Sequence, residues 1–539
     1  MDRDRRTASG RDRRDGSDRR DRSRRTAVKA RLGLAAMIAF APPVLAGAAP
    51  GDALRDPVRS YRASHELAIL SSLSQLLAIP NVASDRENIR LNADAIVAEF
   101  ARRRIPAKLL ESPDAPPAVF AEMRGPATAR RTVVFYAHYD GQPVDPSRWT
   151  GKPWEPVVRD GLLERGGKDV SWAALKPPVD PRFLVYARSA SDDKAAIVGL
   201  LSAVDALQAA GVPPSVHVKF FFEGEEEAGS PHLARILRDN AALLASDLWL
   251  FCDGPVHQSG RKLVFFGTRG VTDVELTAYG ALRRLHSGHY GNWSPNPAVE
   301  IARLIASMRD DEGNIRIAGF SDDVRPPTDA ERRAVAAAPD VDEPLRRELG
   351  LSRTEGAPER IESRILQPAL NVRGLAAGDV GTRATNSIPT EASASIDFRL
   401  VPDQTPERVR EKVEEHLRRQ GYFLVQSVPD EATRLAHPRL LRVAWGAGYP
   451  SSRTSMELPA SRAVVKILSD ATGSPVVRLP TLGGSGPNSL FTEILKAPVI
   501  GVAIANHDNN QHAANENLRI GNLWDGIEMY AALMARLDF

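Results

Sequence analysis

Acidic and histidine side chains stand where the apolar runs of this chain end. The runs and the polar residues that close or follow them are TVVFYAHYD with His138 and Asp140, SVHVKFFFEGEEE with Glu226 and Glu227, DLWLFCD with Asp253, and APVIGVAIANHD with His507 and His512. Asp192 and Asp193 lie just before a helical pattern that begins near Lys194. In open α/β sheets ligands collect beyond the carboxyl ends of the strands, so these groups are expected in one crevice.

Imidazole and carboxylate ligands without cysteine suit one or two divalent metals, and zinc is the most natural choice for such a mixed set. Two adjacent ions need a carboxylate shared between them. They lower the pKa of a water held between them, so a neighbouring carboxylate can take its proton during hydrolysis. A single acidic pair is usually a solvated loop and a single histidine is usually structural. Here, however, acidic or histidine side chains recur at the ends of four apolar runs, and this recurrence favours a metal site.

The elements that position these groups have an α/β pattern. Leu70, Leu73 and Leu77 share one face of a predicted helix, and a second helix is predicted over residues 194–211. Buried strands that alternate with helices indicate a central, mostly parallel sheet. A last helix carries Leu523, Ile527, Tyr530 and Met534 on one face.

Residues 271–448 have a different pattern, with the order βαββαβ of a ferredoxin-like sandwich. We predict the last of its strands at 422–428, and a charged segment at 309–368 interrupts it with irregular helices or a flap. The sequence therefore predicts a catalytic domain in two parts, 55–270 and 449–539, with a smaller domain inserted between them.

The first 48 residues have the composition of an export signal. The 539-residue chain has a formal charge of +3, but residues 1–31 contain 13 basic and six acidic side chains, and the remaining 58 Lys+Arg and 62 Asp+Glu give −4. An uncharged apolar stretch too short to cross a bilayer follows, with small residues at 46–48. Ser23-Arg24-Arg25 is similar to the twin-arginine motif. We expect a removed signal and a periplasmic or secreted protein without stable membrane insertion.

Two alternatives for this leader are a basic arm that binds nucleic acid and a start codon placed too far upstream. Because the positive charge is confined to the leader, we expect no nucleic-acid partner. The lone Cys252 excludes an intramolecular disulfide.

Seven motifs carry a resemblance to a known family. They are HYD at 138–140, SASDDKA at 189–195, EGEEEAGS at 223–230, CDG at 252–254, GTRG at 267–270, LHSGHYG at 285–291 and HAANE at 512–516. Together they resemble the co-catalytic dinuclear zinc peptidases, the family of non-specific dipeptidases, carnosinases, aminoacylases, bacterial glutamate carboxypeptidases and succinyl-diaminopimelate desuccinylase. The spacing and the FRLVP segment are most similar to the dipeptidase branch.

The resemblance implies roles for the residues at the strand ends. It places His138 and Asp253 on one ion, Glu227 and His512 on a second, and Asp192 on both. Asp140 would orient the His138 ring, and Glu226 would be the general base and acid. The implied cofactor is two zinc ions per subunit, with manganese or cobalt as alternatives.

The resemblance also implies substrate-binding residues. His286 would reach into the site of a partner subunit and stabilise the oxyanion, which implies a homodimer formed through the inserted domain. Arg399 would bind a substrate carboxylate with its bidentate fork, and Ser485 would meet the same end of the substrate. A plain turn is the alternative for Ser485.

The expected function is zinc-dependent hydrolysis of dipeptides or short peptides with a free C-terminal carboxylate. The alternatives are an aminoacylase-like amidohydrolase of N-acyl amino acids and, more remotely, an inactive relative that serves as a binding subunit. Ala187, Ser189 and Ala195 stand where relatives usually have glycines, so substrate choice stays open.

Overall fold

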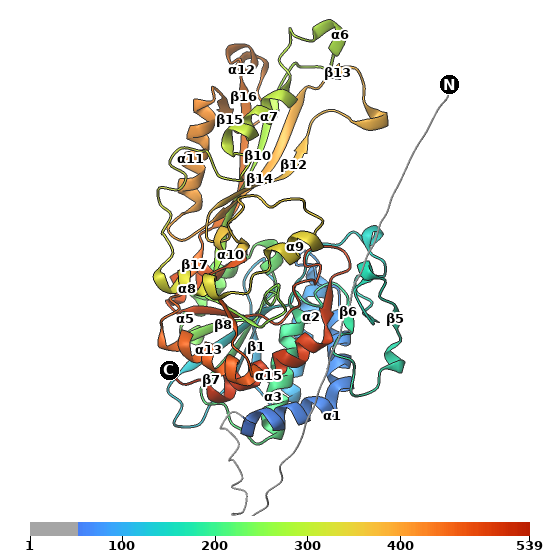
Figure 1. Ribbon diagram of the computed structural model, residues 1–539, viewed down its shortest axis with the longest axis vertical. Helices are drawn as coiled ribbons and strands as arrows, with labels where there is room; N and C mark the ends of the chain where they lie inside the picture. Colours follow the sequence, from blue (N-terminus) through green and yellow to red (C-terminus); the bar gives the residue numbers. More distant parts are fainter. Residues whose placement is uncertain (1–51) are drawn as a thin grey trace, which may run out of the picture. The chain divides into compact units, whose positions relative to one another are not determined.

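The computed structural model describes residues 52–539 (Figure 1). The predicted export signal, residues 1–48, lies outside the described residues. Among the helices that the structure describes, none is long and apolar enough to cross a membrane.

An eight-stranded sheet forms the centre of the larger part of the fold, in the order β1-β2-β7-β3-β8-β20-β9-β18. The four adjacent strands β7, β3, β8 and β20 run parallel to one another, which confirms the predicted mostly parallel α/β sheet. The strands are β1 (Ala107–Leu110), β2 (Ala118–Met123), β3 (Thr132–His138), β7 (His217–Glu223), β8 (Leu248–Phe251), β9 (Leu263–Phe265), β18 (Val477–Leu479) and β20 (Val499–Val502).

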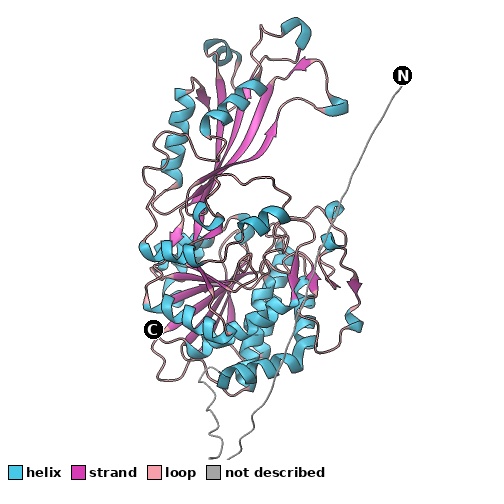
Figure 2. Cartoon of the chain, in the orientation of Figure 1, coloured by secondary structure: helices cyan, strands magenta, loops and turns pink. Residues whose placement is uncertain are grey.

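Both faces of this sheet are buried, which explains why its strands are continuously apolar. Along β3, Val133 and Phe135 pack into one core, and Val134 and Tyr136 pack into the core on the other face. Figure 2 shows helices gathered against the strands of this sheet. The first core is formed with α1 (Asp52–Leu77), α2 (Arg86–Arg102), α3 (Lys194–Ala209), α13 (Pro459–Thr472) and α15 (Ile520–Arg536), and the second with α4 (Leu233–Asp239), α5 (Ala241–Leu244) and a short π-helical segment (Phe491–Leu495).

A second sheet has the order β12-β14-β10-β16-β15, with a separate core. Its strands and the helices that pack beside them are β10 (Gly267–Tyr279), α7 (Pro297–Met308), β12 (Ala369–Ala376), β14 (Glu391–Leu400), α11 (Pro406–Arg419), β15 (Phe423–Val425) and β16 (Leu440–Tyr449). Figure 1 shows α7 and α11 beside these strands. The predicted ferredoxin-like fold is present.

The last strand of the sandwich differs from the prediction. Residues 422–428 contain only the three-residue edge strand β15, whereas β16 pairs with β10 along most of its length. Gly446 and Gly448 lie inside β16, and an ideal Cβ at Gly448 would stand 2.7 Å from the carbonyl oxygen of Val271. Close approach to β10 therefore requires glycine, a residue that weakens the strand pattern of the sequence.

The charged segment 309–368 folds into short helices, as expected. They are α8 (Asp329–Ala337), α9 (Asp342–Glu348) and α10 (Ile361–Arg364). A further four-stranded sheet has the order β21-β6-β4-β5 and consists of β21 (Asn517–Arg519), β6 (Leu184–Tyr186), β4 (Val157–Arg159) and β5 (Asp169–Val170). Because β21 follows the loop of His512 and β6 precedes Asp192, this sheet joins two loops of the site.

Candidate dinuclear metal site

The predicted ligands converge at the carboxyl edge of the large sheet. His138 is the last residue of β3, Asp253 follows β8, and Glu227 lies in the short turn Glu226–Ala228 after β7. Asp192 comes just before α3, and His512 lies in the loop after β20. The peptide bond between Asp192 and Asp193 is cis.

These five side chains form two groups of three that share one carboxylate. His138, Asp192 and Asp253 make one group and Asp192, Glu227 and His512 the other, with the ligand atoms of each group all within 4.8 Å of one another. The Nε2 atom of His138 is 2.8 Å from Oδ1 of Asp192, and Nε2 of His512 is 3.1 Å from Oδ2. The two oxygens of Asp192 therefore face different histidines, as a carboxylate that bridges two cations requires.

The charge balance of this cluster fits two divalent cations. Burial first, and then the charge of Asp192, raise the pKa of Glu227 to about 7 and that of Asp253 to about 6. The buried Oδ1 atom of Asp253 has no hydrogen-bond partner among the described residues. Crowded carboxylates and an orphaned buried oxygen are costly without a counter-charge, and a bound cation supplies one. The donor set of imidazole and carboxylate is one that zinc accepts.

Asp140 belongs to neither group and contacts three parts of the site. It is fully buried. Its Oδ1 atom lies 3.3 Å from Nδ1 of His138 and accepts a hydrogen bond of 3.1 Å from the backbone N–H of Glu226. Its Oδ2 accepts one of 2.9 Å from the N–H of Glu227. Asp140 thus fixes the His138 ring and the turn that carries both glutamates.

Glu226 lies beside the cluster without belonging to either group. Burial, followed by the charges of Glu227, Asp253 and Asp192 outweighing that of His138, raises the pKa of its carboxyl well above the usual value. A carboxyl group with a raised pKa is suited to carry a proton between two reacting groups.

Glu516 is a supporting residue to which the sequence analysis assigned no role. It is fully buried, and its carboxylate accepts hydrogen bonds from the backbone N–H groups of Ser189, Ser191 and Asp192 at 2.9 to 3.0 Å. Arg188 Nη1 donates a further one at 2.8 Å. Glu516 therefore holds the loop that presents Asp192. In the sequence, Glu516 is the last residue of the HAANE motif, and membership of this motif is the signal that could have identified it.

Arg399 and Ser485, two predicted substrate-binding residues, lie together. Nη1 of Arg399 donates to Oγ of Ser485 at 2.8 Å, and Nε donates to Oδ2 of Asp397 at 3.0 Å. Ser485 Oγ in turn donates to the carbonyl of Gly270 at 3.2 Å. The three residues form one polar group at the junction of β10, β14 and β19 (Leu482–Ser485), so Ser485 ends a strand that pairs with β10 and does not lie in the plain turn that was the alternative.

His286, the third predicted substrate-binding residue, is not brought to the metal cluster within one chain. Its exposed side chain accepts a hydrogen bond of 3.1 Å from the N–H of Gly288 and contacts His289 at 4.5 Å between ring centroids, with the rings tilted by 38°. Neither contact involves the five residues of the two groups.

Known proteins are similar to this chain in architecture and, at about a quarter of the aligned residues, in sequence. The Cys-Gly metallodipeptidase dug1 of Schizosaccharomyces pombe is 24% identical over 87% of this chain and 95% of its own length. The human Beta-Ala-His dipeptidase is 24% identical over 83% of this chain and 82% of its own length. Among solved structures, the M20 family metallo-carboxypeptidase Sso-CP2 from Sulfolobus solfataricus matches with a TM-score of 0.70 and 26% identity, covering 87% of this chain and 98% of that one. Human carnosine dipeptidase 1 matches with a TM-score of 0.70 and 21% identity, covering 90% of this chain and 100% of that one.

The family model described as peptidase family M20/M25/M40 matches residues 134–536, a span that contains the whole cluster and the inserted sheet. The resemblance stated from the motifs is confirmed, and dipeptidases are prominent among the relatives. The chain belongs to peptidase family M20/M25/M40 and is a hydrolase of peptide bonds.

Proposed function

We propose that this protein is a dinuclear zinc exopeptidase that cleaves dipeptides or short peptides with a free C-terminal carboxylate. The observation that carries the proposal is the pair of ligand groups joined through Asp192, with Glu226 beside them. The dipeptidase names of the relatives support the choice of substrate. Arg399 and Ser485 supply a place for the carboxylate.

Two bound cations would polarise the scissile carbonyl and lower the pKa of the attacking water. Glu226 takes a proton from that water as it attacks the carbonyl carbon. The same carboxyl then gives the proton to the leaving nitrogen as the C–N bond breaks, because an amine leaves only when it is protonated. Asp140 keeps Glu226 in position through the hydrogen bond that its Oδ1 accepts from the Glu226 N–H.

The test is hydrolysis of a dipeptide panel by zinc-loaded protein, with N-acyl amino acids tested in parallel. We expect free amino acids to be released from dipeptides. Cleavage of N-acyl amino acids without cleavage of any dipeptide would instead support the aminoacylase alternative. Zinc binding without hydrolysis of either class would support an inactive binding relative.

Replacement of Arg399 tests the carboxylate site. Arg399→Ala should raise KM for dipeptides by about tenfold to a hundredfold, since a hydrogen-bonded ion pair is lost. Substrates with a C-terminal amide lack the carboxylate and should be affected far less. Steady-state kinetics on matched acid and amide substrates measure this. Arg303→Ala, on the exposed face of α7, is the control. Equal losses on acids and amides would refute the role.

We further propose that the active protein is a homodimer assembled through the inserted domain, with His286 acting in the partner's site. Strand β12 is an edge of the inserted sheet, and Leu375 is 59% exposed. Val380, just beyond the strand, is 78% exposed. An unpaired edge with exposed apolar side chains favours pairing with another chain. His286 lies outside the cluster of its own chain, and a second copy paired through this edge would supply the histidine to a site.

Mixing two inactive variants tests the contribution of His286 across the dimer. His286→Ala and Glu226→Gln should each lose activity, and co-refolding them should restore about a quarter of the wild-type rate, because half of the dimers are mixed and have one intact site in two. Activity is measured after co-refolding and compared with each variant refolded alone. A mixture no more active than its components would exclude the shared site.

Residues 1–48 are proposed to direct export to the periplasm or beyond. The supporting observation is the charge and hydropathy pattern of the leader. Fractionation of cells that express the full chain tests this, and retention in the cytoplasm with an intact leader would contradict it.

A further inference from the structure

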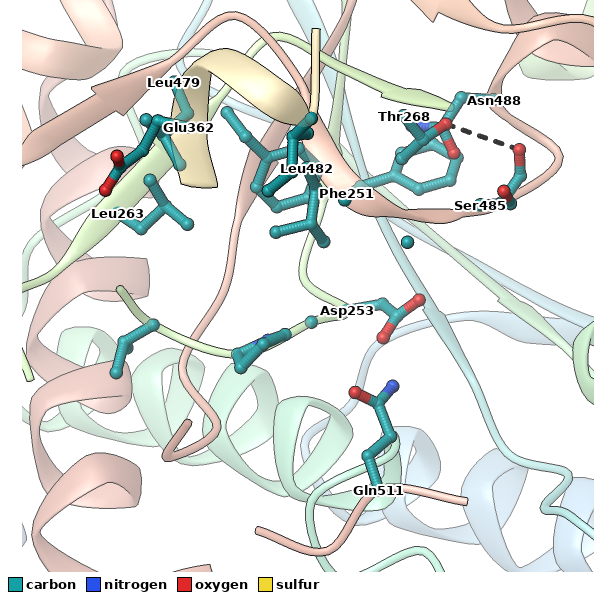
Figure 3. A pocket seen from close by; sticks show the side chains of 18 of the residues that line it. Phe251, Asp253, Leu263, Thr268, Glu362, Leu479, Leu482, Ser485, Asn488 and Gln511 are labelled. Atoms are coloured by element: carbon teal, nitrogen blue, oxygen red, sulfur yellow. Dashed lines mark hydrogen bonds between the residues drawn. The ribbon is translucent and has the colours of Figure 1, made fainter. Parts of the chain in front are cut away.

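A largely apolar cavity of about 230 Å³ adjoins the metal cluster. Figure 3 shows Asp253 and Gln511 facing each other near Ser485 and Asn488, while Leu263 and Leu479 lie farther from Asp253. The volume is several times the roughly 30 Å³ that a water molecule occupies in the liquid. Six apolar side chains form much of the wall, namely Phe251, Leu263, Phe265, Ile365, Leu479 and Leu482.

The polar end of the cavity coincides with the proposed carboxylate site. Ser485, which accepts from Arg399, lines the cavity together with Asn488. Asn488 is 1% exposed, and among the described residues its Nδ2 has no hydrogen-bond partner. A buried amide donor without a partner is costly, and a substrate carboxylate or carbonyl would satisfy it. Asp253 of the first ligand group lines the same end.

These positions orient the substrate. With its carboxylate at Ser485 and its scissile amide at the metal cluster, the C-terminal residue lies between the two. That residue stands at the mouth of the cavity, so its side chain is the part of the substrate that enters.

One wall comes from the inserted domain and packs tightly on strand β19, which ends at Ser485. The Cδ1 atom of Ile365 stands 3.2 Å from where a Cβ on Gly483 would lie, so a side chain there would crowd it. Arg269 donates to the carbonyl of Gly483 at 3.1 Å and to that of Gln367 at 3.2 Å. The guanidinium of Arg269 therefore connects the chain after α10 to strand β19, which holds Ser485.

The charged group in the wall is already paired. Glu362 is 3% exposed, with Oε1 at 3.3 Å from Nε2 of His257 and Oε2 at 3.1 Å from Nη2 of Arg360. Among the described residues Glu362 Oε2 accepts no hydrogen bond, but the guanidinium of Arg360 compensates its charge. The cavity thus offers mainly apolar surface at this end, where a charged side chain would lose much of its hydration.

We infer that this cavity binds the side chain of the C-terminal residue and selects dipeptides in which that residue is aliphatic or aromatic. The inference rests on the proposed function. It separates this chain from relatives named for Cys-Gly and Beta-Ala-His, whose C-terminal residues are glycine and histidine.

The test compares kcat/KM of the zinc-loaded full chain for Ala-Leu, Ala-Phe, Ala-Gly, Ala-Lys and Ala-Asp. Burial of a large apolar side chain is expected to favour Ala-Leu and Ala-Phe over Ala-Gly by about tenfold to a hundredfold. Hydrolysis in which Ala-Gly or the charged dipeptides are the better substrates would overturn the inference and leave the proposed function intact. No turnover of any dipeptide would overturn both.

Variants at Ile365 link the preference to this wall. Ile365→Asp should lower the ratio of kcat/KM for Ala-Leu to Ala-Gly by at least about tenfold. Ile365→Thr, a smaller change if the aspartate variant misfolds, should lower it in the same direction. Leu349→Asp, 61% exposed in the same segment, is the control. An unchanged ratio in a folded, zinc-binding Ile365 variant would contradict the inference.

Discussion

Glu226→Gln is expected to retain two zinc ions and to lose roughly 10²- to 10⁴-fold in kcat, the range supplied by a positioned proton carrier. Glutamine has nearly the same shape, but it takes up no proton from water and has none to give to the leaving nitrogen. Because Glu226 belongs to neither ligand group, its replacement should leave zinc content unchanged. Metal analysis and steady-state kinetics on the same preparation measure both quantities.

Glu155→Gln is the matched control for this variant. Glu155 is 65% exposed and pairs with Lys152 at the surface, so the same chemical change there should leave kcat unaltered. Turnover of Glu226→Gln within a few-fold of the wild type would exclude Glu226 as the proton carrier. Loss of zinc together with activity would instead identify it as a ligand.

Asp192→Asn is expected to abolish activity by removing the carboxylate that both groups share. An asparagine side chain has one oxygen and no charge. It therefore cannot offer one anionic oxygen to each of the two ligand groups, as Asp192 does. Zinc at a concentration of about one hundred times its Kd raises the free energy of unfolding of a protein that binds it only when folded, by about 2.7 kcal/mol. The wild type should gain this stability, seen as a higher unfolding midpoint, and Asp192→Asn should lose most of the gain.

Asp239→Asn provides the comparison, since Asp239 is a surface carboxylate, 66% exposed, on α4. Circular dichroism of the metal-free Asp192→Asn protein verifies that it folds. A folded variant that still takes up two zinc ions with wild-type affinity would refute the bridging role.

The strand-end groups could be predicted from sequence because burial on both faces makes a strand continuously apolar. His138 and Asp253 come directly at or after such runs, and the parallel order of β3 and β8 brings their ends together. Glu516 was not assigned a role, because its hydrogen bonds reach backbone groups more than 300 residues away. No local pattern reports a contact of that range.

Two further features could not be predicted from the sequence, the last strand of the inserted sheet and the wall of the cavity. Strand β16 contains glycines because its backbone lies close to β10. Glycines are more typical of turns and loops than of strands, so the sequence pattern did not indicate this strand. The role of α10 depends on Ile365 meeting Gly483 and on Glu362 meeting His257, contacts between residues about a hundred positions apart. The charged composition of 309–368 gave no indication of a substrate-facing wall.

Titration of metal-free protein with zinc, with Ala-Leu hydrolysis recorded at each addition, tests the two-cation site most directly. If Asp192 joins two ions in one catalytic centre, activity should rise until two zinc ions per chain are bound and then level off. Full activity at one ion per chain, or two bound ions without hydrolysis of any dipeptide, would contradict the account.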